Sequence, residues 1–264
     1  MAPRMGWTFR EMGEADLDAV AAVLRHVESE EAEEALEAMR ESLEHRFVLV
    51  HGERVDGVTG FREVPDTDRS YWLSYTGLEP GEATGDDLIL PLLDRLRTLG
   101  ARKLFVMLGD ADSAPGSIRR SGGAREFYEE LGFSIEARHA DYYDRSDGAI
   151  VMGLRLAGEP RPAGKLPDPG RIRITDSDEI DETDDAYYIE WEFAGEDPET
   201  SPREFDDWIG RLREWEARVA FLGLPSDAKA AAAQVLEAGF TEDGRLTDLI
   251  EDGIHEVRYR YDLI

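Results

Sequence analysis

The sequence predicts an α/β protein with a mixed, mostly antiparallel sheet flanked by helices, followed by a second, smaller α/β unit. Along residues 7–156, apolar residues recur with strand-like and helix-like periods in alternation. The stretch "AGEPRPAGKLPDPG" is the clearest linker, because its prolines and glycines interrupt both periods. We therefore expect a first domain at 1–157, a linker at 158–170 and a second domain at 171–264.

The first domain is predicted to begin with a strand, two helices and an antiparallel meander. "GWTFREM" is a short strand, and Glu14 opens a helix with apolar residues at helical spacing. Ser29 is a good N-cap for a second helix, which carries one apolar stripe. The meander comprises "RFVLVHGERVDGVTGFREV", with two β-rich runs around a polar turn, and the aromatic strand "DRSYWLSYTGL".

The rest of the first domain alternates helix and strand before two closing strands. A helix runs through "LILPLLDRLRTLG", where Pro91 either kinks it or marks its start. The apolar strand "KLFVML" follows, and then a long loop rich in glycine, serine and proline. The stretch "AREFYEELGF" predicts a helix, and "IEARHADYY" and "AIVMGLRL" predict the last two strands.

Composition narrows the classes of partner. The chain has 59 acidic against 30 basic residues, a formal charge of -29, and its only lysines are Lys103, Lys165 and Lys229. This pattern resembles proteins of salt-accumulating halophiles, where a Debye length of about 3 Å at 1 M salt screens the repulsion. A GC-rich genome is the alternative, but it explains arginine over lysine and not the charge. With no basic stripe, we expect no nucleic-acid partner.

The chain shows no signal of membrane targeting or metal binding. "MAPRMGWTFREM" lacks the apolar core of a signal peptide, and no run of about 18 apolar residues could span a bilayer. We therefore expect a cytoplasmic protein without a membrane partner. The absence of cysteine excludes disulfides and thiolate catalysis, and the five histidines lack metal-ligand spacing, so no metal site is expected.

The predicted order of elements resembles the GNAT superfamily of acetyl-CoA-dependent N-acyltransferases. The resemblance covers about residues 7–156, and its most specific part is "AREFYEELGF" followed by "DYYDRSDGAIVMGLRL". It implies an N-acetyltransferase with acetyl-CoA as co-substrate. The acceptor would be a primary amine on a small molecule or a peptide, attacking the thioester directly.

Within this resemblance, Tyr128 is the candidate catalytic acid. The matching tyrosine of the family often protonates the departing thiolate of CoA. Adjacent residues on a helix point about 100° apart, so we expect Phe127 to pack beneath the sheet and Tyr128 to face the cleft. The alternative is that both rings pack at the edge of a core.

The segment "PGEATG" matches the family's pyrophosphate loop, which binds an anion through backbone N–H groups at a helix N-terminus. Pro80 replaces the usual arginine or glutamine, and nearby carboxylates would repel a pyrophosphate unless they point outward. A plain turn before a helix is the alternative. The resemblance assigns cofactor binding to Gly81, Ala83, Thr84, Gly85 and, in place of a family asparagine, Ser121.

A general base is not evident. Glu79 lies at the end of the aromatic strand and Glu63 lies on the preceding strand. Each is better explained as a solvated surface carboxylate than as a base, and a water chain would serve equally well.

The last hundred residues resemble a truncated second copy of the first domain. "DRLRTLGARKLFVMLGD" and "GRLREWEARVAFLGLPS" match at an offset of 116, and Gly132-Phe133 recurs as Gly239-Phe240 at an offset of 107. Chance similarity between two α/β segments is the alternative. We interpret this copy as degenerate, because "EDPETS" replaces the phosphate loop and Val235 replaces Tyr128. It would serve as an internal pseudo-twofold mate in a monomer, or the chain would form a homodimer.

Two functions therefore stay open. One is an acetyl-CoA-dependent N-acetyltransferase that uses the first domain. The other is a catalytically degenerate GNAT-like module that binds a metabolite or regulates a partner. The feature that separates them is whether the strands beside the cleft splay apart and leave backbone N–H groups for a thioester carbonyl.

Overall fold

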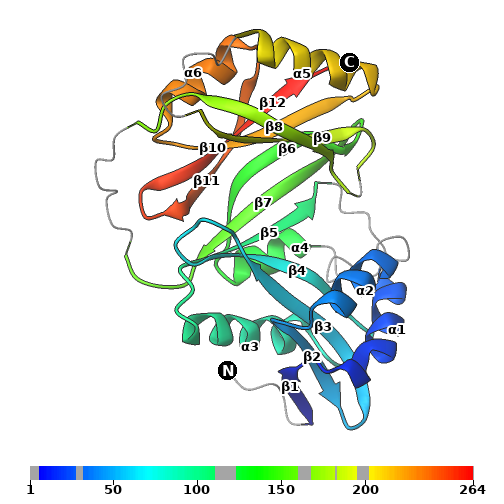
Figure 1. The fold of residues 1–264 in the computed structure, drawn as a ribbon. Coiled ribbons are helices and arrows are strands. Elements are labelled where there is room, and N and C mark those ends of the chain that lie inside the picture. Colours follow the sequence, from blue (N-terminus) through cyan, green and yellow to red (C-terminus); the bar gives the residue numbers. More distant parts are fainter. Residues whose placement is uncertain are drawn as a thin grey trace. The chain divides into compact units, whose positions relative to one another are not determined.

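The computed structural model describes residues 6–27, 32–110, 123–159, 168–181, 183–194 and 202–263 (Figure 1). The chain forms two compact units. The first comprises Met1–Ser134 and Met152–Gly158, and the second comprises Ile135–Val151 and Glu159–Ile264. The second unit thus includes the strands that follow the "AREFYEELGF" helix. The domain boundaries expected at residues 157 and 171 stay a prediction, because these two compact units divide the chain differently.

The first unit holds a mixed sheet in the order β1-β2-β3-β4-β5. Neighbours pair antiparallel except β4 and β5, which pair in parallel. This agrees with the predicted mixed, mostly antiparallel sheet. The elements that lie in this unit are β1 (Trp7–Glu11), η1 (Glu14–Asp16), α1 (Leu17–Val27), α2 (Ala32–Glu41), β2 (Arg46–His51), β3 (Arg54–Glu63), β4 (Ser70–Leu78), α3 (Gly85–Thr98), β5 (Lys103–Gly109) and α4 (Ala124–Glu130).

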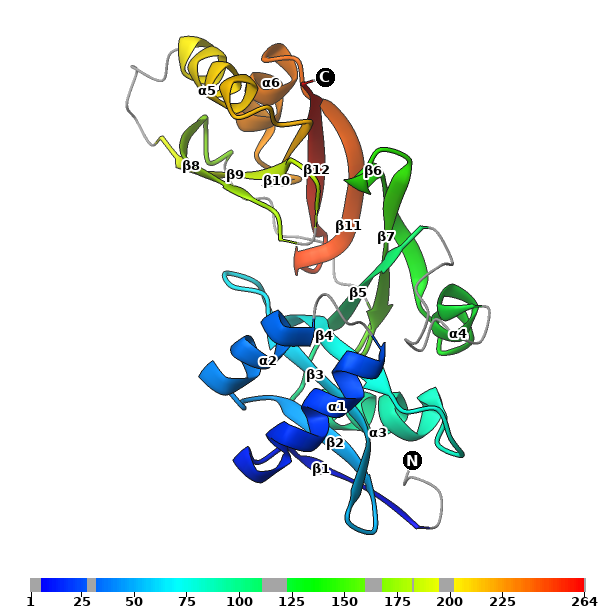
Figure 2. The ribbon, with the colours of Figure 1, turned by 90° about the vertical axis from the view of Figure 1, so that its right-hand side faces the viewer.

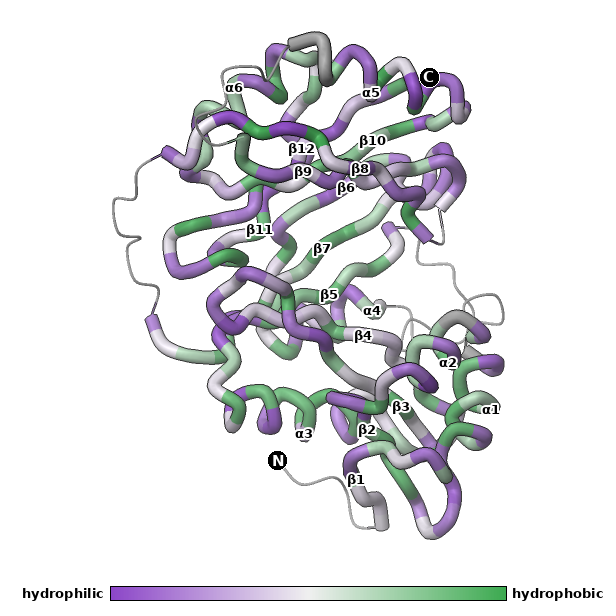
Figure 3. Tube along the Cα trace, in the orientation of Figure 1, coloured by the Kyte–Doolittle hydropathy of each residue, from purple (hydrophilic) through white to green (hydrophobic). Residues whose placement is uncertain are grey.

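Helices cover both faces of this sheet, as Figure 2 shows for α1 and α2 on one side and α3 on the other. Strand β2 is buried on both faces, and its "RFVLVH" sequence is an almost continuous apolar run (Figure 3). Val48 packs in the cluster of α1 and α2, while its neighbour Leu49 packs with Leu88 of α3. The alternation follows from the two-residue period of a strand. Helix α3 begins at Gly85, so Pro91 lies inside it rather than at its start.

The second unit has the sheet order β7-β6-β11-β12-β10-β9-β8. Strands β9 and β10 pair in parallel, whereas β6–β11, β11–β12, β12–β10 and β9–β8 pair antiparallel. Helices α5 and α6 pack with Ile189, Leu222 and Val257 of this sheet in one apolar core. The elements that lie wholly or mostly in this unit are β6 (Ser134–Asp144), β7 (Asp147–Arg155), β8 (Ile172–Glu179), β9 (Ala186–Phe193), α5 (Pro202–Glu214), β10 (Val219–Pro225), α6 (Lys229–Glu237), β11 (Thr241–Glu251) and β12 (Ile254–Asp262).

Element bounds recur between the two parts of the chain at the offsets seen in the sequence. The parallel pairing of β4 and β5 starts at Ser70 and Lys103, and that of β9 and β10 starts at Ala186 and Val219, each 116 positions later. Strands β11 and β12 have the bounds of β6 and β7 moved by 107 positions.

Individual hydrogen bonds recur at the same offset. The Nε atom of Arg102 donates to the carbonyl oxygen of Asp68 at 2.8 Å. The Nε atom of Arg218 donates to the carbonyl oxygen of Asp184 at 3.0 Å, and both residues lie 116 positions later. A shared sequence offset therefore carries shared local geometry.

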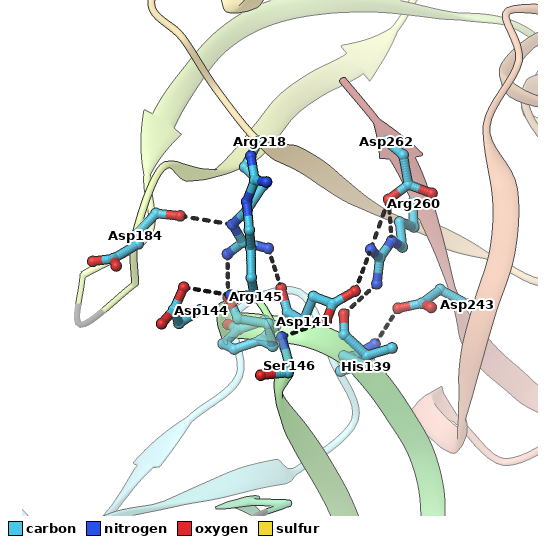
Figure 4. A network of polar contacts seen from close by, with 12 residues as sticks. His139, Asp141, Asp144, Arg145, Ser146, Asp184, Arg218, Asp243, Arg260 and Asp262 are labelled. Atoms are coloured by element: carbon cyan, nitrogen blue, oxygen red, sulfur yellow. Dashed lines mark hydrogen bonds and ion pairs between the residues drawn. The ribbon is translucent and has the colours of Figure 1, made fainter. Parts of the chain in front are cut away.

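Strands β6 and β11 meet inside the second unit in an antiparallel contact (Figure 4). Their paired residues are Ala137 and Gly244, which are themselves 107 positions apart. A residue that pairs with its own counterpart is the mark of a local twofold axis. The buried ring of His139 contacts the carboxylate of Asp243 at this contact through Nδ1.

The helices of the described ranges can be compared with the length and hydropathy of a membrane-spanning helix. Among them, no helix combines the length and apolar character needed to cross a bilayer.

Candidate functional site

The parallel pair of β4 and β5 opens shortly after it begins. Its register runs from Ser70–Lys103 to Trp72–Phe105, although β4 continues to Leu78. Every residue of both strands is described, and no pair between them lies beyond Trp72–Phe105. The two strands therefore splay apart, which is the feature that separates the two functions considered above.

Exposure along β4 agrees with this opening. A strand inside a sheet covered by helices is normally buried on both faces. In β4, however, each residue from Trp72 to Thr76 is partly exposed, and on β5 so is Met107. The splay thus leaves partly accessible residues inside the sheet.

A bulge lies in β4 at the same level. Its pairing with β3 passes from Gly60–Ser74 directly to Val58–Gly77, so two residues of β4 oppose one residue of β3. Bulges bend a strand and change where its side chains point, and they are common beside active sites. The bulge explains why β4 leaves β5 here.

The predicted phosphate loop precedes α3 and is closed by a carboxylate of the helix itself. The Asp87 carboxylate accepts hydrogen bonds from the N–H of Thr84 at 2.9 Å and from its hydroxyl at 2.8 Å. The N–H of Asp87 donates back to the carbonyl of Thr84. Thr84 is therefore the N-cap of α3, and this pair forms a capping box.

The acidic residues around the loop do not share one environment. Glu82 and Asp86 are exposed, whereas Asp87 is buried and serves the cap. The N–H groups of Gly85 and Asp86 belong to the first turn, where a helix offers no internal acceptor. These donors and the positive end of the helix dipole remain at the loop.

Gly85 is required by a contact between helices α3 and α4. A Cβ atom at this position would lie 2.7 Å from Cζ of Phe127. The glycine therefore makes room for the aromatic ring, and its φ is not positive. By contrast, the nearest atom to a Cβ at Gly81 is the carbonyl oxygen of Glu79 at 4.0 Å, so that part of the loop is open.

The exposures of the two adjacent aromatic residues are the reverse of the expectation. Tyr128 is 3% exposed, and its ring makes edge contacts with Phe127 and Phe133 at centroid distances of 5.2 Å. Phe127 is the partly exposed ring. It lies against Gly85 at the start of α3. Tyr128 is thus held rigidly rather than standing free in a cleft, and its role stays a prediction.

A cavity of about 270 Å³ borders the loop on the side of α1. Its lining includes Gly81 and Glu82 of the loop, Ala22 of α1 and Arg54 of β3. Ala83 also lines it and is otherwise buried with Leu49 and Leu88. The loop therefore combines one anchored residue with an open stretch.

The remaining predicted site residues differ in their exposure and contacts. Glu79 is partly exposed at the end of β4, and its N–H donates to the carbonyl of Asp56 at 2.8 Å. Glu63 is exposed, and after burial it is the second cause that raises the pKa of the Tyr71 hydroxyl. Ser121, and the "EDPETS" stretch of the second copy, lie outside the described residues.

Sequence reasoning missed Arg46, which begins β2 and crosses the sheet to the β4 bulge. Its guanidinium donates to the hydroxyl of Ser74. The register places Arg46, Gly60 and Ser74 opposite one another on β2, β3 and β4. Gly60 leaves the path open, because a Cβ there would lie 3.0 Å from Cδ of Arg46. A glycine opposite an arginine was the only sequence signal.

The second unit repeats the splay but fills it. Strands β9 and β10 pair only from Ala186–Val219 to Tyr188–Phe221. Beyond that point, the indole Nε1 of Trp191 donates to the carbonyl of Gly223 at 2.8 Å, and Gly223 is buried. This opening is closed by its own side chains.

The described residues hold no group of three or more side chains suited to a metal ion. Of the histidines, His139 is buried and contacts Asp243 within the second unit.

Comparison with known proteins gives the fold. No family model and no curated protein matches the chain. A solved acetyltransferase structure from Desulfovibrio desulfuricans, described as of the GNAT family, is 24% identical and superposes with a TM-score of 0.50. That match covers 57% of this chain and 99% of the other. The chain carries the GNAT fold.

Further structures with this fold superpose less closely. Ard1 from Thermoplasma volcanium is 19% identical, with a TM-score of 0.48, over 58% of this chain and 100% of its own. The yncA protein of Salmonella typhimurium, solved with its cofactor acetyl-CoA, is 16% identical, with a TM-score of 0.47, over 60% and 98%. The first superposition confirms the expected α/β fold class and GNAT-like fold.

Proposed function

We propose that the protein is an N-acetyltransferase that transfers the acetyl group of acetyl-CoA to a primary amine by direct attack on the thioester. The observation that carries this proposal is the splay of β4 from β5 after Trp72–Phe105. A strand without its neighbour offers backbone donors inside a sheet, as stabilisation of a developing oxyanion requires. The GNAT fold of the chain supports the same class of reaction.

The residues of the first unit fit acetyl-CoA as the co-substrate, which supplies the acetyl group as a thioester. At this helix N-terminus, the first-turn N–H groups of Gly85 and Asp86 are the donors that would bind a pyrophosphate. Gly81 borders open space, so an anion can approach the backbone there. The exposed carboxylates of Glu82 and Asp86 can turn outward into salt.

Tyr128 is our candidate for the acid that protonates the leaving sulfur. Its ring is fixed between Phe127 and Phe133, so little side-chain freedom is lost when it acts. A general acid must lie within hydrogen-bond reach of the sulfur, and a fixed ring would keep that distance the same from one turnover to the next.

For the second unit we propose a structural role as a copy that binds no acetyl-CoA. Three observations support it: the repeated strand registers, the filling of the second splay by Trp191, and the apolar Val235 at the position of Tyr128. The chain would then have one acetyl-CoA site, in the first unit, and a second unit whose corresponding opening is closed.

The first test is calorimetric titration with acetyl-CoA in KCl, comparing wild type with Gly81→Glu. This substitution suits the test because a Cβ at Gly81 meets nothing closer than 4.0 Å, whereas Gly85→Glu would also collide with Phe127. We expect micromolar binding by wild type. The added carboxylate should weaken it roughly tenfold at 0.2 M KCl and less at 2 M, because salt screens the repulsion.

Gly210→Glu is the matched control, since it adds the same charge on α5 where a Cβ meets no atom within 4 Å. It should leave binding unchanged. In assays of acetyl transfer, Tyr128→Phe should lower kcat about 100-fold or more without changing the affinity for acetyl-CoA. Tyr71→Phe changes another buried tyrosine and should have no such effect. No binding by folded wild type would reject the enzyme and favour the binding or regulatory module.

A further inference from the structure

Arg46 is a half-buried cation in an unusual position. It lies in one row with Gly60 and Ser74 across three strands, and residues directly opposite one another share a face of the sheet. The face is that of Val48, against which α1 and α2 pack, because alternate residues of β2 point the same way. The guanidinium therefore reaches the β4 bulge from the side of α1 and α2.

No carboxylate pairs with Arg46 anywhere in the part of the chain that the structure describes. Its hydrogen bond goes to the neutral hydroxyl of Ser74, and its Nε atom is buried without a partner. Two other arginines of the first unit show the usual pairing. Arg10 contacts Asp16 at 2.6 Å and Arg25 contacts Glu33 at 2.7 Å. An unpaired arginine is unexpected in a chain with 59 acidic residues.

Stability alone does not explain such a residue. Removing a charged group from water is costly unless it is paired, and the buried Nε adds an unmade hydrogen bond. Burial lowers the pKa of the Arg46 guanidinium, Tyr75 opposes that shift, and the nearby Arg62 adds to it. No acidic residue of the described ranges contributes, so this positive charge has no acidic neighbour there that compensates it.

Position connects the site to the proposed reaction. Ser74 and Tyr75 stand at the bulge where β4 turns away from β5, beside the backbone that would receive the thioester. Arg62 lies two residues after Gly60 and so shares its face. Arg62 is exposed and has no ion pair among the described residues. Two cations that have no ion pair among the described residues thus lie on this face of the sheet, near the point where β4 leaves β5.

We propose that Arg46, assisted by Arg62, binds a carboxylate of the acceptor, so that the acceptor is an amine that also carries a carboxylate, as an amino acid does. The inference rests on the proposed function and names its substrate class. A guanidinium suits this task because its planar donors match a carboxylate in a bidentate way. The high negative charge of the chain would by itself have suggested a purely cationic amine.

The test compares free L-amino acids with their amides as acceptors. An amide keeps the amine and the side chain but removes the negative charge. CoA release can be followed with a thiol reagent, because the chain contains no cysteine. We expect wild type to favour at least one acid over its amide by about 10- to 100-fold in kcat/KM, the range for hydrogen bonds between charged groups.

Arg46→Met should raise KM for that acid and bring the preference close to one, while the affinity for acetyl-CoA stays unchanged. Arg46→Lys keeps the charge but not the fork, and should retain part of the preference. Thermal melting supplies a second readout: Arg46→Met should keep or raise the Tm, because it removes an unpaired buried charge. Arg10→Met, which breaks the ion pair with Asp16, should lower the Tm and keep the preference.

Three outcomes would overturn the inference: equal rates for acids and amides, no turnover of any acid by protein that binds acetyl-CoA, or an unaltered preference in Arg46→Met. A Tm lowered as far as in Arg10→Met would show that Arg46 stabilises the fold instead. If acetyl-CoA does not bind at all, the proposed function fails separately. Direct titration of wild type and Arg46→Met with the amino acids then still decides whether the carboxylate site exists.

Discussion

At the scale of single residues, the charged side chains of the first unit differ in whether they have a partner of opposite charge. Asp16 is 9% exposed, yet the hydrogen bond from Arg10, ahead of that from the N–H of Gly13, holds its pKa below the usual range. Arg46 shows the opposite case of a cation without an acid. The first kind of residue supports the fold, and the second is free to bind.

The Arg10–Asp16 pair predicts a pH-dependent stability. Because the pKa of Asp16 is lower in the folded state, its stabilisation is present above the unfolded pKa of about 3.9 and is lost as the pH falls through the folded value. Asp16→Asn should therefore lower the free energy of unfolding at pH 7 by about 1 kcal/mol, since Arg10 is 44% exposed. The difference from wild type should shrink as the pH falls below the unfolded value.

Urea unfolding in 2 M KCl at pH 7, 5 and 3 measures this difference. Asp18→Asn removes the same charge from an exposed position on α1 without an ion pair among the described residues, and should show little effect at any pH. A gap between wild type and Asp16→Asn that stays constant with pH would contradict the linkage argument.

The adjacent aromatic residues show what sequence reasoning could reach at this scale. The helical period correctly separates the two rings, so that one is buried and the other partly exposed. Which ring is buried depends on Gly85, a residue of another helix, where the missing Cβ admits Phe127. Such a contact between distant segments leaves no local signal.

At the scale of elements, the contact of α3 with α4 couples the phosphate loop to the helix of the candidate acid. The ring of Phe127 lies on Gly85, and the next residue is Tyr128. A shift of α4 would therefore move both the loop and the tyrosine. The loop was predictable as a cap, because Thr84 and Asp87 have the spacing of a capping box.

Gly85→Ala tests this coupling. The new Cβ at 2.7 Å from Phe127 forces the ring aside, and overpacking of this kind costs about 1–3 kcal/mol. Adding Phe127→Leu should recover much of that loss, so the double mutant should be more stable than the sum of the single effects predicts. Urea unfolding of the four proteins measures the coupling energy.

Gly210→Ala is the control for the coupling, because open space surrounds that glycine of α5. It should stabilise the protein by up to about 1 kcal/mol through helix propensity. Additive effects of Gly85→Ala and Phe127→Leu would show that the two helices do not meet as described.

Other elements show where prediction from sequence ends. Strands and helices of both parts follow from hydrophobic periods, and the order of the elements agrees with the prediction. The splay of β4 from β5 does not follow, because it depends on a bulge opposite Thr59 and on pairing partners remote in sequence. The candidate site is thus the least local part of the fold.

At the scale of the whole molecule, two sets of elements with matching bounds differ at the splay between their parallel strands. In the second set, Trp191 closes the splay onto Gly223 and Val235 provides no hydroxyl. Where β6 meets β11, Ala137 pairs with its counterpart Gly244, as two copies of one strand would pair in a symmetric dimer. The offsets of 116 and 107 were readable in the sequence, whereas this local axis was not.

This arrangement predicts one acetyl-CoA per chain. Calorimetry should give a stoichiometry close to one for wild type, and native mass spectrometry should show a single added ligand at saturation. Gly81 belongs to the loop of the first unit. Gly81→Glu should therefore weaken acetyl-CoA binding at this one site, and no second site of unchanged affinity should remain. Trp191→Ala should not add a site, since Val235 and the buried β10 backbone remain. Two acetyl-CoA molecules per chain, or a tight site that survives Gly81→Glu, would mean that the second set of elements also binds acetyl-CoA. Either result would contradict the purely structural role proposed for the second unit.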